Sequence, residues 1–305
     1  MSANLVELWN RAWSSAEGLK RTIRIGFLCS FTLLAAPANE CSPGTPDPTE
    51  ASASISGPYA FQTYTSGFAD SPAYGGATIY YPTNAPTPFA GVAVSPGFVE
   101  TQANTNGWGR FLASHGFVVL TFETNSLQEL PPARATALLA AIDTLKAESG
   151  RAGSPLFGKM YPDRYGIMGH SMGGGGALIA AQNSRTDIRA AIPYTPWNSS
   201  TNFSGVRKPT LIMGATLENL APTASHAWPF YQSINADLAG AKAYIQFRTG
   251  DHGVANDPLW DGPNQKIVAR YGLSWLKMYV LDDMRYQQFI QPNAAFEAAR
   301  YQYIP

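Results

Sequence analysis

Cysteine and charge are both scarce in this sequence. Its two cysteines, Cys29 and Cys41, precede the part of the chain that has the composition of a folded domain, so no disulfide can cross-link that domain. Secreted domains of this size do not require one. Charged residues make up 14% of the chain, and 21 Lys and Arg balance 21 Asp and Glu. Because the chain has no net charge, we expect neither nucleic acid nor an acidic membrane surface as a partner.

The first 38 residues have the order of a secretory signal. Basic residues at positions 20, 21 and 24 precede the apolar run 25–36, which is too short to span a bilayer comfortably, and small residues follow at 36–38. We predict cleavage after Ala38 and a secreted mature protein, extracellular or periplasmic, with no membrane span. An uncleaved anchor, or a start codon assigned too early, is the alternative.

Residues 39–56 are predicted to be a disordered lead-in, because they are rich in Pro, Ser, Thr, Ala and Glu. Cys41 is expected there as a free thiol, since the residues before it do not suit a lipid-attachment site. Residues 57–305 are predicted to form a single catalytic domain.

Strands and helices alternate over this domain. The expected strands cover 78–81, 91–95, 117–121, 165–168, 190–194, 210–213 and 242–247. The expected helices cover 108–115, 132–148, the residues after 171, 225–236 and 266–280. This alternation predicts an α/β fold with a doubly wound, mostly parallel sheet flanked by helices. The segment 171–218 has no room for a large lid domain, so the site is expected to be an open cleft.

The motif Gly169-His170-Ser171-Met172-Gly173 lies between an expected strand and a run of small residues. A Gly-x-Ser-x-Gly sequence in this context is typical of the nucleophile elbow, which holds a serine hydroxyl exposed on a sharp turn. The following helix directs free N–H groups towards the place where an oxyanion would form. The sequence therefore predicts acyl-transfer chemistry at Ser171, with an ordinary glycine-rich turn as the alternative.

The base can be chosen from four histidines by elimination. His115 ends an expected helix and is interpreted as structural. His170 adjoins the nucleophile, where it would line the cleft or pack beneath it, and His226 is interpreted as a surface or packing residue. His252 lies on a glycine-flanked loop after the final strand. It also comes last of the candidate residues in the chain, as the catalytic-triad order Ser, Asp or Glu, His requires. We predict that it is the base, and a simple turn histidine is the alternative.

Glu218 is the only carboxylate in the loop 214–222, which follows the strand 210–213. Glutamate is an accepted third member of such triads. Asp251 is adjacent to the base and poorly placed to bond its far ring nitrogen, whereas Asp257 lies a few residues further on. The acid is therefore predicted to be Glu218, with Asp257 as the alternative and a solvated loop glutamate as the simplest interpretation.

One oxyanion donor is predicted to be the N–H of Met172, directly after the nucleophile, and the other an N–H after the strand 91–95. Phe98 is the candidate there, and its ring would form one apolar wall of the cleft. Trp197 could supply an opposing wall by stacking. Either aromatic residue could instead be an ordinary core residue.

Several motifs, in order along residues 57–286, resemble those of the bacterial cutinases and poly(ethylene terephthalate) hydrolases. They are Tyr80-Tyr81-Pro82-Thr83-Asn84, Pro96-Gly97-Phe98, Ala113-Ser114-His115-Gly116-Phe117-Val118-Val119, Thr124-Asn125-Ser126, the glycine-rich elbow, Pro196-Trp197, Ser200-Thr201-Asn202-Phe203 and Ala221-Pro222. The resemblance implies a secreted α/β-hydrolase that cleaves polyesters. It also implies that Ser171 and His252 are nucleophile and base, that Phe98 and Met172 are oxyanion donors, that Trp197 stacks on the substrate and that Leu220 is an apolar cleft residue.

The chain departs from that family in three respects. Glu218 stands where the family has aspartate. His170 agrees with the cutinase-like members, whereas the subgroup most noted for aromatic polyester carries tryptophan. The family's usual C-terminal cysteines are missing, and Ala215 and Val254 occupy the positions of a further pair found in some members.

The resulting hypothesis is a secreted, monomeric serine ester hydrolase that acts on cutin-like aliphatic polyesters, with aromatic polyester as a further class. Its catalytic residues would be Ser171, Glu218 and His252, and Phe98, Trp197, Leu220 and His170 would contact the substrate. No metal and no organic cofactor is implied. The alternatives are a small-molecule carboxylesterase or lipase with the same mechanism, and a non-catalytic relative that binds polymer or lipid.

Overall fold

A nine-stranded sheet organises the part of the chain that the structure describes. The computed structural model describes residues 46–69, 71–262, 264–292 and 297–305, so the predicted signal at 1–38 lies outside it. The strands are β1 (Phe61–Tyr64), β2 (Gly76–Pro82), β3 (Phe89–Ser95), β4 (Phe117–Glu123), β5 (Met160–His170), β6 (Ile188–Tyr194), β7 (Thr210–Ala215), β8 (Lys242–Phe247) and β9 (Ala298–Ile304). Their order across the sheet is β1-β2-β4-β3-β5-β6-β7-β8-β9.

The centre of the sheet is parallel and its edges are antiparallel. All neighbouring pairs from β4 through β3 and β5 to β8 run parallel, while β1 with β2, β2 with β4 and β8 with β9 run antiparallel. The predicted mostly parallel sheet is confirmed, and so is the β3-α2-β4 crossover. The sequence missed β1 and β9, which lie at the two edges and have several exposed side chains.

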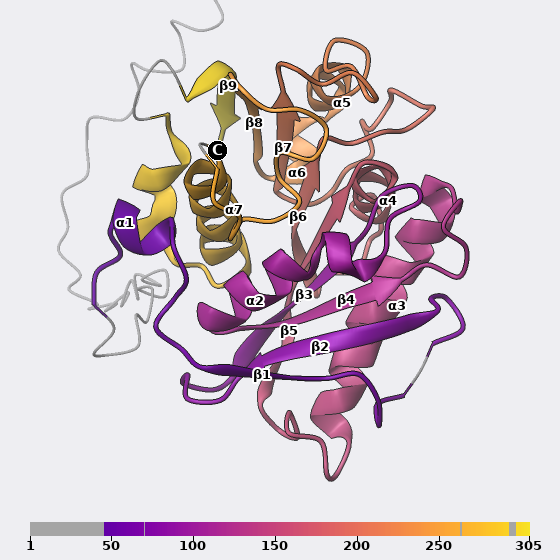
Figure 1. The fold of residues 1–305 in the computed structure, drawn as a ribbon, viewed down its shortest axis with the longest axis vertical. Coiled ribbons are helices and arrows are strands. Elements are labelled where there is room, and N and C mark those ends of the chain that lie inside the picture. Colours follow the sequence, from indigo (N-terminus) through magenta and orange to yellow (C-terminus); the bar gives the residue numbers. More distant parts are fainter. Residues whose placement is uncertain (1–45, 70, 263, 293–296) are drawn as a thin grey trace, which may run out of the picture. The chain divides into compact units, whose positions relative to one another are not determined.

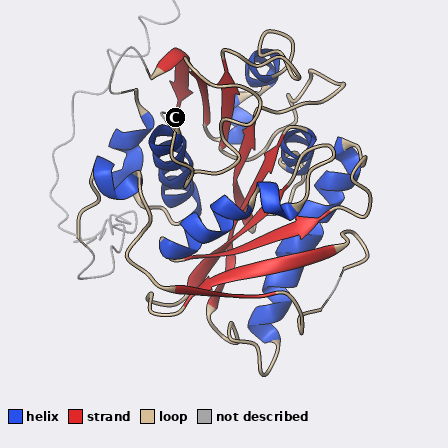
Figure 2. Ribbon diagram, in the orientation of Figure 1, coloured by secondary structure: helices blue, strands red, loops and turns tan. Residues whose placement is uncertain are grey.

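Helices cover both faces of this sheet (Figures 1 and 2). They are α1 (Glu50–Ala53), α2 (Asn106–Ser114), α3 (Pro131–Gly150), α4 (Met172–Ala180), α5 (Ala227–Ser233), α6 (Ala236–Ala239) and α7 (Gln265–Val280), with 3₁₀ turns at Gln102–Asn104 and Met284–Ile290. Apolar residues of α2 and α7 join one buried cluster, and those of α3, α4 and α5 join another on the opposite face. In Figure 1, α2 and α7 cross in front of the strands and α3 passes behind them. The predicted doubly wound α/β fold is therefore confirmed.

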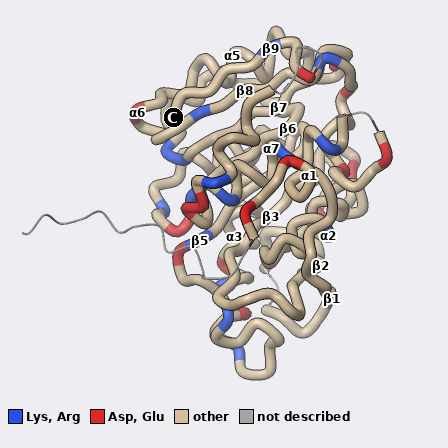
Figure 3. Tube along the Cα trace, turned by 90° about the vertical axis from the view of Figure 1, so that its left-hand side faces the viewer, with Lys and Arg blue, Asp and Glu red and all other residues tan. Residues whose placement is uncertain are grey.

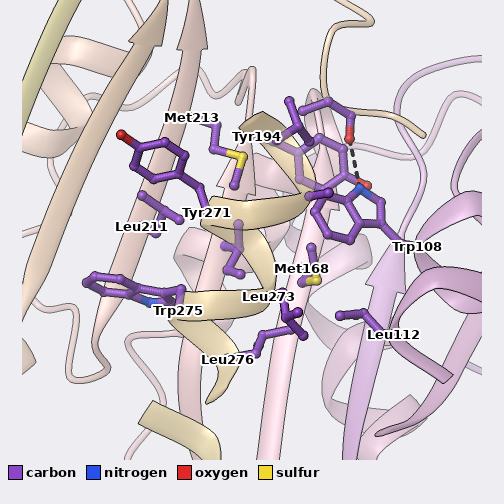
Figure 4. Close-up of a cluster of buried hydrophobic side chains, with 14 of the residues drawn as sticks. Trp108, Leu112, Met168, Tyr194, Leu211, Met213, Tyr271, Leu273, Trp275 and Leu276 are labelled. Carbon is purple, nitrogen blue, oxygen red and sulfur yellow. Dashed lines mark hydrogen bonds between the residues drawn. The ribbon is translucent and has the colours of Figure 1, made fainter. Parts of the chain in front are cut away.

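The cluster under α2 and α7 contains the largest buried aromatic side chains. Trp108 of α2 and Trp275 of α7 are fully buried, and their neighbours include Met168 of β5 and Met213 of β7 (Figure 4). The indole N–H of Trp108 donates to the carbonyl of Ala255 at 2.8 Å. Because a buried indole N–H needs an acceptor, this bond also fixes the loop that follows β8.

Two local expectations differ from the structure. Residues 225–236, predicted as one helix, form α5 and α6, because Ile234 adopts an extended conformation and the Asn235 side chain caps the second helix. In the segment predicted as a disordered lead-in, residues 50–53 form α1. Thr49 caps this short helix, and Ala53 is buried in the cluster under α7. The described end of the lead-in is thus ordered.

Charged residues of both signs are interspersed along the trace (Figure 3). Within the described residues, no helix combines the length and the apolar character needed to cross a membrane.

Candidate active site

The predicted site residues follow the carboxyl ends of parallel strands. Phe98 follows β3, Ser171 follows β5, Trp197 follows β6, Glu218 follows β7 and His252 follows β8. These five strands are consecutive in the sheet, so their carboxyl ends lie along one edge. Between Ser171 and Glu218 the chain forms only α4, β6, β7 and their connections, which leaves no inserted lid in this fully described segment.

Ser171 has the backbone conformation of a nucleophile elbow. Its φ of 51° and ψ of −116° are rare for a residue with a side chain, and they turn the chain sharply from β5 into α4. The turn needs small neighbours, because a Cβ on Gly173 would lie 2.4 Å from the carbonyl oxygen of Pro96. The main-chain carbonyl of Ser171 accepts hydrogen bonds from Gly175 and Trp197, which hold the elbow in place.

Glu218 and His252 form a short carboxylate–imidazole contact. His252 Nδ1 lies 2.6 Å from Glu218 Oε2, and Glu218 Oε1 accepts the N–H groups of Leu220 at 2.7 Å and Ala221 at 2.8 Å. Burial alone would raise the pKa of Glu218, but these hydrogen bonds lower it below its usual value. Glu218 is therefore an ionised acceptor, and the proton of the imidazole is held on Nδ1.

The remaining ring nitrogen of His252, Nε2, is the one that could accept a proton from a nucleophile. In the described structure the Ser171 hydroxyl and the His252 ring are not hydrogen-bonded to each other. His170, which directly precedes Ser171, contacts the residue of the base instead: its Nε2 lies 2.8 Å from the His252 carbonyl oxygen, and the rings of His170 and His252 pack at a centroid distance of 4.6 Å. Such catalytic contacts commonly tighten only when substrate binds.

The two alternative acids have other partners. Asp257 pairs with Arg110 at 3.2 Å and accepts the N–H of Leu259, and Asp251 accepts the N–H of Gly253. Neither carboxylate contacts the ring of His252 among the described interactions. The geometry therefore favours Glu218 over both aspartates.

The structure gives the other histidines different roles. His115 is buried, its Nε2 lies 2.9 Å from the carbonyl of Ile55, and burial lowers its pKa to about 4, as suits a structural residue. His226 packs against the rings of Trp197 and Phe230, in agreement with the expected packing role.

His170 was expected to contact substrate, and its position corrects that expectation. Its side chain is only 2% exposed. Its two ring nitrogens lie 2.7 Å from Glu100 Oε2 and 2.8 Å from the carbonyl oxygen of His252. With both edges of the ring occupied by protein, His170 lies beneath the site instead of lining it.

The two expected oxyanion donors flank the nucleophile. A Cβ on Gly97 would lie 3.1 Å from Ser171 Cβ, so the loop carrying Phe98 runs directly beside the serine. The N–H of Phe98 donates no hydrogen bond in the described part of the chain. Met172 is the first residue of α4, where an N–H has no acceptor within the helix. Both amides are therefore available to a bound oxyanion.

Arg134 fixes this loop and was not found from the sequence. It is fully buried, and its guanidinium donates to the carbonyls of Pro96 at 2.9 Å, Glu129 at 2.9 Å and Leu127 at 3.2 Å. No sequence motif joins a residue of α3 to a loop 38 positions earlier. Only the folded structure brings Arg134 and this loop into contact.

Apolar side chains surround the site. Phe98 is 42% exposed and Leu220 is 68% exposed, while Trp197 is half-buried against His226. Their positions suit contact with an apolar substrate. Among the described residues, no group of three or more His, Cys, Asp or Glu side chains is arranged to hold a metal ion.

Comparison with known proteins finds consistent similarity over most of the chain. The profile of the PETase family, described as PET hydrolase-like, matches residues 35–303. The chain is 41% identical over 269 residues to cutinase cut1 of Thermobifida fusca, covering 87% of this chain and 80% of that protein. It is also 41% identical over 249 residues to cutinase 2 of Thermobifida cellulosilytica and to bis(hydroxyethyl) terephthalate hydrolase of Streptomyces coelicolor. Each of these matches covers 81% of this chain, with 90% and 76% of the respective relatives.

Proposed function

This chain belongs to the PETase family of PET hydrolase-like proteins, and we propose that Ser171 is its nucleophile, His252 its base and Glu218 its orienting acid. The chain is a carboxylic ester hydrolase of the cutinase and polyester hydrolase type. The observation that carries the assignment is the 2.6 Å contact of His252 Nδ1 with a carboxylate whose other oxygen is fixed by two main-chain amides.

In the proposed mechanism, His252 Nε2 removes the proton from Ser171 Oγ as that oxygen attacks the ester carbonyl. The N–H groups of Phe98 and Met172 stabilise the negative oxygen of the tetrahedral intermediate. The imidazolium then returns its proton to the leaving alcohol, and an acyl-enzyme forms on Ser171. Water, activated by His252, hydrolyses this ester and releases the acid.

Replacement of the nucleophile tests the proposal directly. Ser171→Ala should abolish both p-nitrophenyl butyrate hydrolysis and labelling by a fluorophosphonate, while the melting temperature stays near that of the wild type. Ser204→Ala, at an exposed serine away from the elbow, is the matched control and should retain both. Undiminished turnover by Ser171→Ala would refute the assignment.

The substrate class is proposed from the relatives and from the open, apolar surroundings of the site. One relative is named a bis(hydroxyethyl) terephthalate hydrolase and others are named cutinases. We therefore propose that aliphatic polyesters are cleaved and that aromatic polyesters are a further substrate class. Product release from films of both polymers, compared with turnover of short soluble esters, tests this. Hydrolysis of soluble esters alone would favour a small-molecule esterase.

Export and oligomeric state are part of the same proposal. Basic residues at 20, 21 and 24, the apolar run 25–36 and the small residues at 36–38 support secretion with cleavage after Ala38. N-terminal sequencing of protein recovered outside the cytoplasm would identify the cleavage site. We propose a monomer, which light scattering coupled to size-exclusion chromatography tests.

A further inference from the structure

Glu100 is a carboxylate beneath the site to which the proposed mechanism gives no role. It lies five residues after the end of β3, and its side chain is 15% exposed. Its Oε2 accepts the N–H of Gly97 at 2.6 Å and lies 2.7 Å from His170 Nδ1, while Oε1 accepts from the Asn256 side chain at 3.0 Å. Three groups thus converge on one carboxylate next to the nucleophile elbow.

The hydrogen-bond partners of His170 determine its protonation state. The carbonyl oxygen of His252 can only accept, so the proton of that bond belongs to His170 Nε2. Glu100 already accepts two N–H groups, which stabilise its ionised form. Burial would raise the pKa of Glu100, but its hydrogen bonds with His170, Gly97 and Asn256 lower it. An ionised Glu100 needs a donor at His170 Nδ1, so both ring nitrogens carry a proton.

His170 thereby connects the nucleophile to the base. It precedes Ser171 in the chain, and its Nε2–H holds the main-chain carbonyl of His252. The hydroxyl of Thr195 donates to the same carbonyl at 2.7 Å. The loop that carries the base is therefore bound by side chains that extend from the ends of β5 and β6.

We propose that Glu100 keeps His170 as an imidazolium, and that this buried ion pair positions the His252 loop for proton transfer. Glu100 and His170 are then positioning residues, which touch neither substrate nor the reacting atoms. The inference rests on the proposed function, since it assigns a role relative to His252 as the base. If the carboxylate is removed, a neutral His170 can donate only one hydrogen bond, and either the His252 carbonyl or residue 100 loses its donor.

Other ionisable groups face this pair. Arg134 of α3 and Tyr194 of β6 lie close enough to interact electrostatically with Glu100, and the rings of Tyr194 and His252 pack against His170. Glu218 contacts Nδ1 of the His252 ring. Of these groups, only Glu100 lies within hydrogen-bond distance of His170 Nδ1, so its charge is the one that holds the Nδ1 proton.

Nitrogen-15 NMR of the wild-type protein at pH 8 measures the protonation state directly. We expect one histidine whose two ring nitrogens both show imidazolium shifts, and the signal should be missing in His170→Asn. A neutral His170 at this pH would overturn the proposal. This readout does not depend on ester hydrolysis, so it stays informative even if the proposed function fails.

Kinetics then test the positioning role. Glu100→Gln, which keeps the size and removes the charge, should lower kcat for p-nitrophenyl butyrate by roughly 10-fold with little change in KM, because small displacements of a catalytic group are costly. The deficit should accompany loss of the His170 imidazolium signal from the nitrogen-15 spectrum of the variant. Glu148→Gln is the matched control. Glu148 is also a buried, multiply hydrogen-bonded carboxylate. It lies near the C-terminal end of α3, whereas Arg134 lies near the N-terminal end. That variant should lose stability but keep kcat and the His170 imidazolium signal.

The double variant Glu100→Gln/His170→Asn separates two routes of action. If Glu100 acts through His170, the double variant should match His170→Asn alone within a factor of about 2, since residues in one network are not additive. Additive losses would instead assign the effect to the Gly97 contact and refute the proposal. An unchanged kcat in Glu100→Gln would also refute the proposal, provided that the wild type hydrolyses the ester and is labelled by the fluorophosphonate. A wild type inactive in both assays would refute the proposed function.

Discussion

Replacing Glu218 with glutamine should disable the base through its tautomer. In the native structure Oε1 accepts two main-chain N–H groups, from Leu220 and Ala221, and Oε2 faces Nδ1 of His252. A glutamine in the same place must keep its carbonyl oxygen towards the two amides, because an NH₂ group there would oppose two donors. Its NH₂ then faces Nδ1, which must become an acceptor.

The consequence is a proton on the wrong ring nitrogen. With Nδ1 accepting, His252 Nε2 carries the hydrogen and cannot take the proton of Ser171. A similar tautomer change in a serine protease triad lowers kcat by about 10⁴. We therefore expect Glu218→Gln to lower kcat by roughly 10³- to 10⁴-fold. The loss should persist across pH 6–9, because it arises from a tautomer and not from a titration.

The assay is steady-state hydrolysis of p-nitrophenyl butyrate together with the rate of fluorophosphonate labelling. Both should fall in parallel, and thermal unfolding should show that the variant is folded. Asp257→Asn is the control, since Asp257 binds Arg110 and the N–H of Leu259. It should leave kcat near the wild-type value. A Glu218→Gln variant within 10-fold of the wild type, or an equal loss in Asp257→Asn, would refute the reasoning.

Three further predictions concern packing, pH and the substrate. Gly272→Ala should lower the unfolding free energy by about 1–3 kcal/mol in urea titration, because its Cβ would lie 2.4 Å from the buried ring of Trp108; an unchanged midpoint would contradict this. Hydrogen bonds from Arg185 hold the pKa of Asp187 well below its usual value, so this carboxylate contributes stability above pH 4 that is lost as the pH falls through its folded pKa. The stability difference between wild type and Asp187→Asn should therefore shrink from pH 5 towards pH 2, and a constant difference would count against the ion pair. Trp197→Ala should reduce aromatic-polyester hydrolysis by roughly 3- to 10-fold more than p-nitrophenyl butyrate hydrolysis, because only the aromatic polymer would lose a stacking contact. Equal losses on the two substrates would argue against stacking.

The parts of the fold that the sequence predicted are those with local signals. Central strands such as β3 and β7 are largely apolar runs because both of their faces are buried. The elbow at Ser171 is a contiguous motif, and four histidines left few choices for the base. The edge strand β9 carries exposed polar residues between its apolar ones, so it had no comparable signal.

The missed or corrected site residues depend on distant contacts. Glu100 and His170 are 70 residues apart, and Arg134 reaches a loop 38 positions earlier. His170 was expected to contact substrate because its place beside Ser171 is visible in the sequence, whereas its two acceptors are not. Sequence spacing therefore pointed to the groups that we propose to react, but not to the groups that hold them.

Arg270 has a practical consequence for where a shortened chain could begin. Its guanidinium, in α7, is buried and pairs with Glu50 of α1 and with Glu297 near β9. A chain that starts at residue 57, where the family motifs begin, would lack α1 and with it Glu50. Arg270 would then keep a single acidic partner, and the surface that α1 covers would be exposed. Expression boundaries for this protein are therefore better placed before Thr49, which caps α1, than at the first family motif.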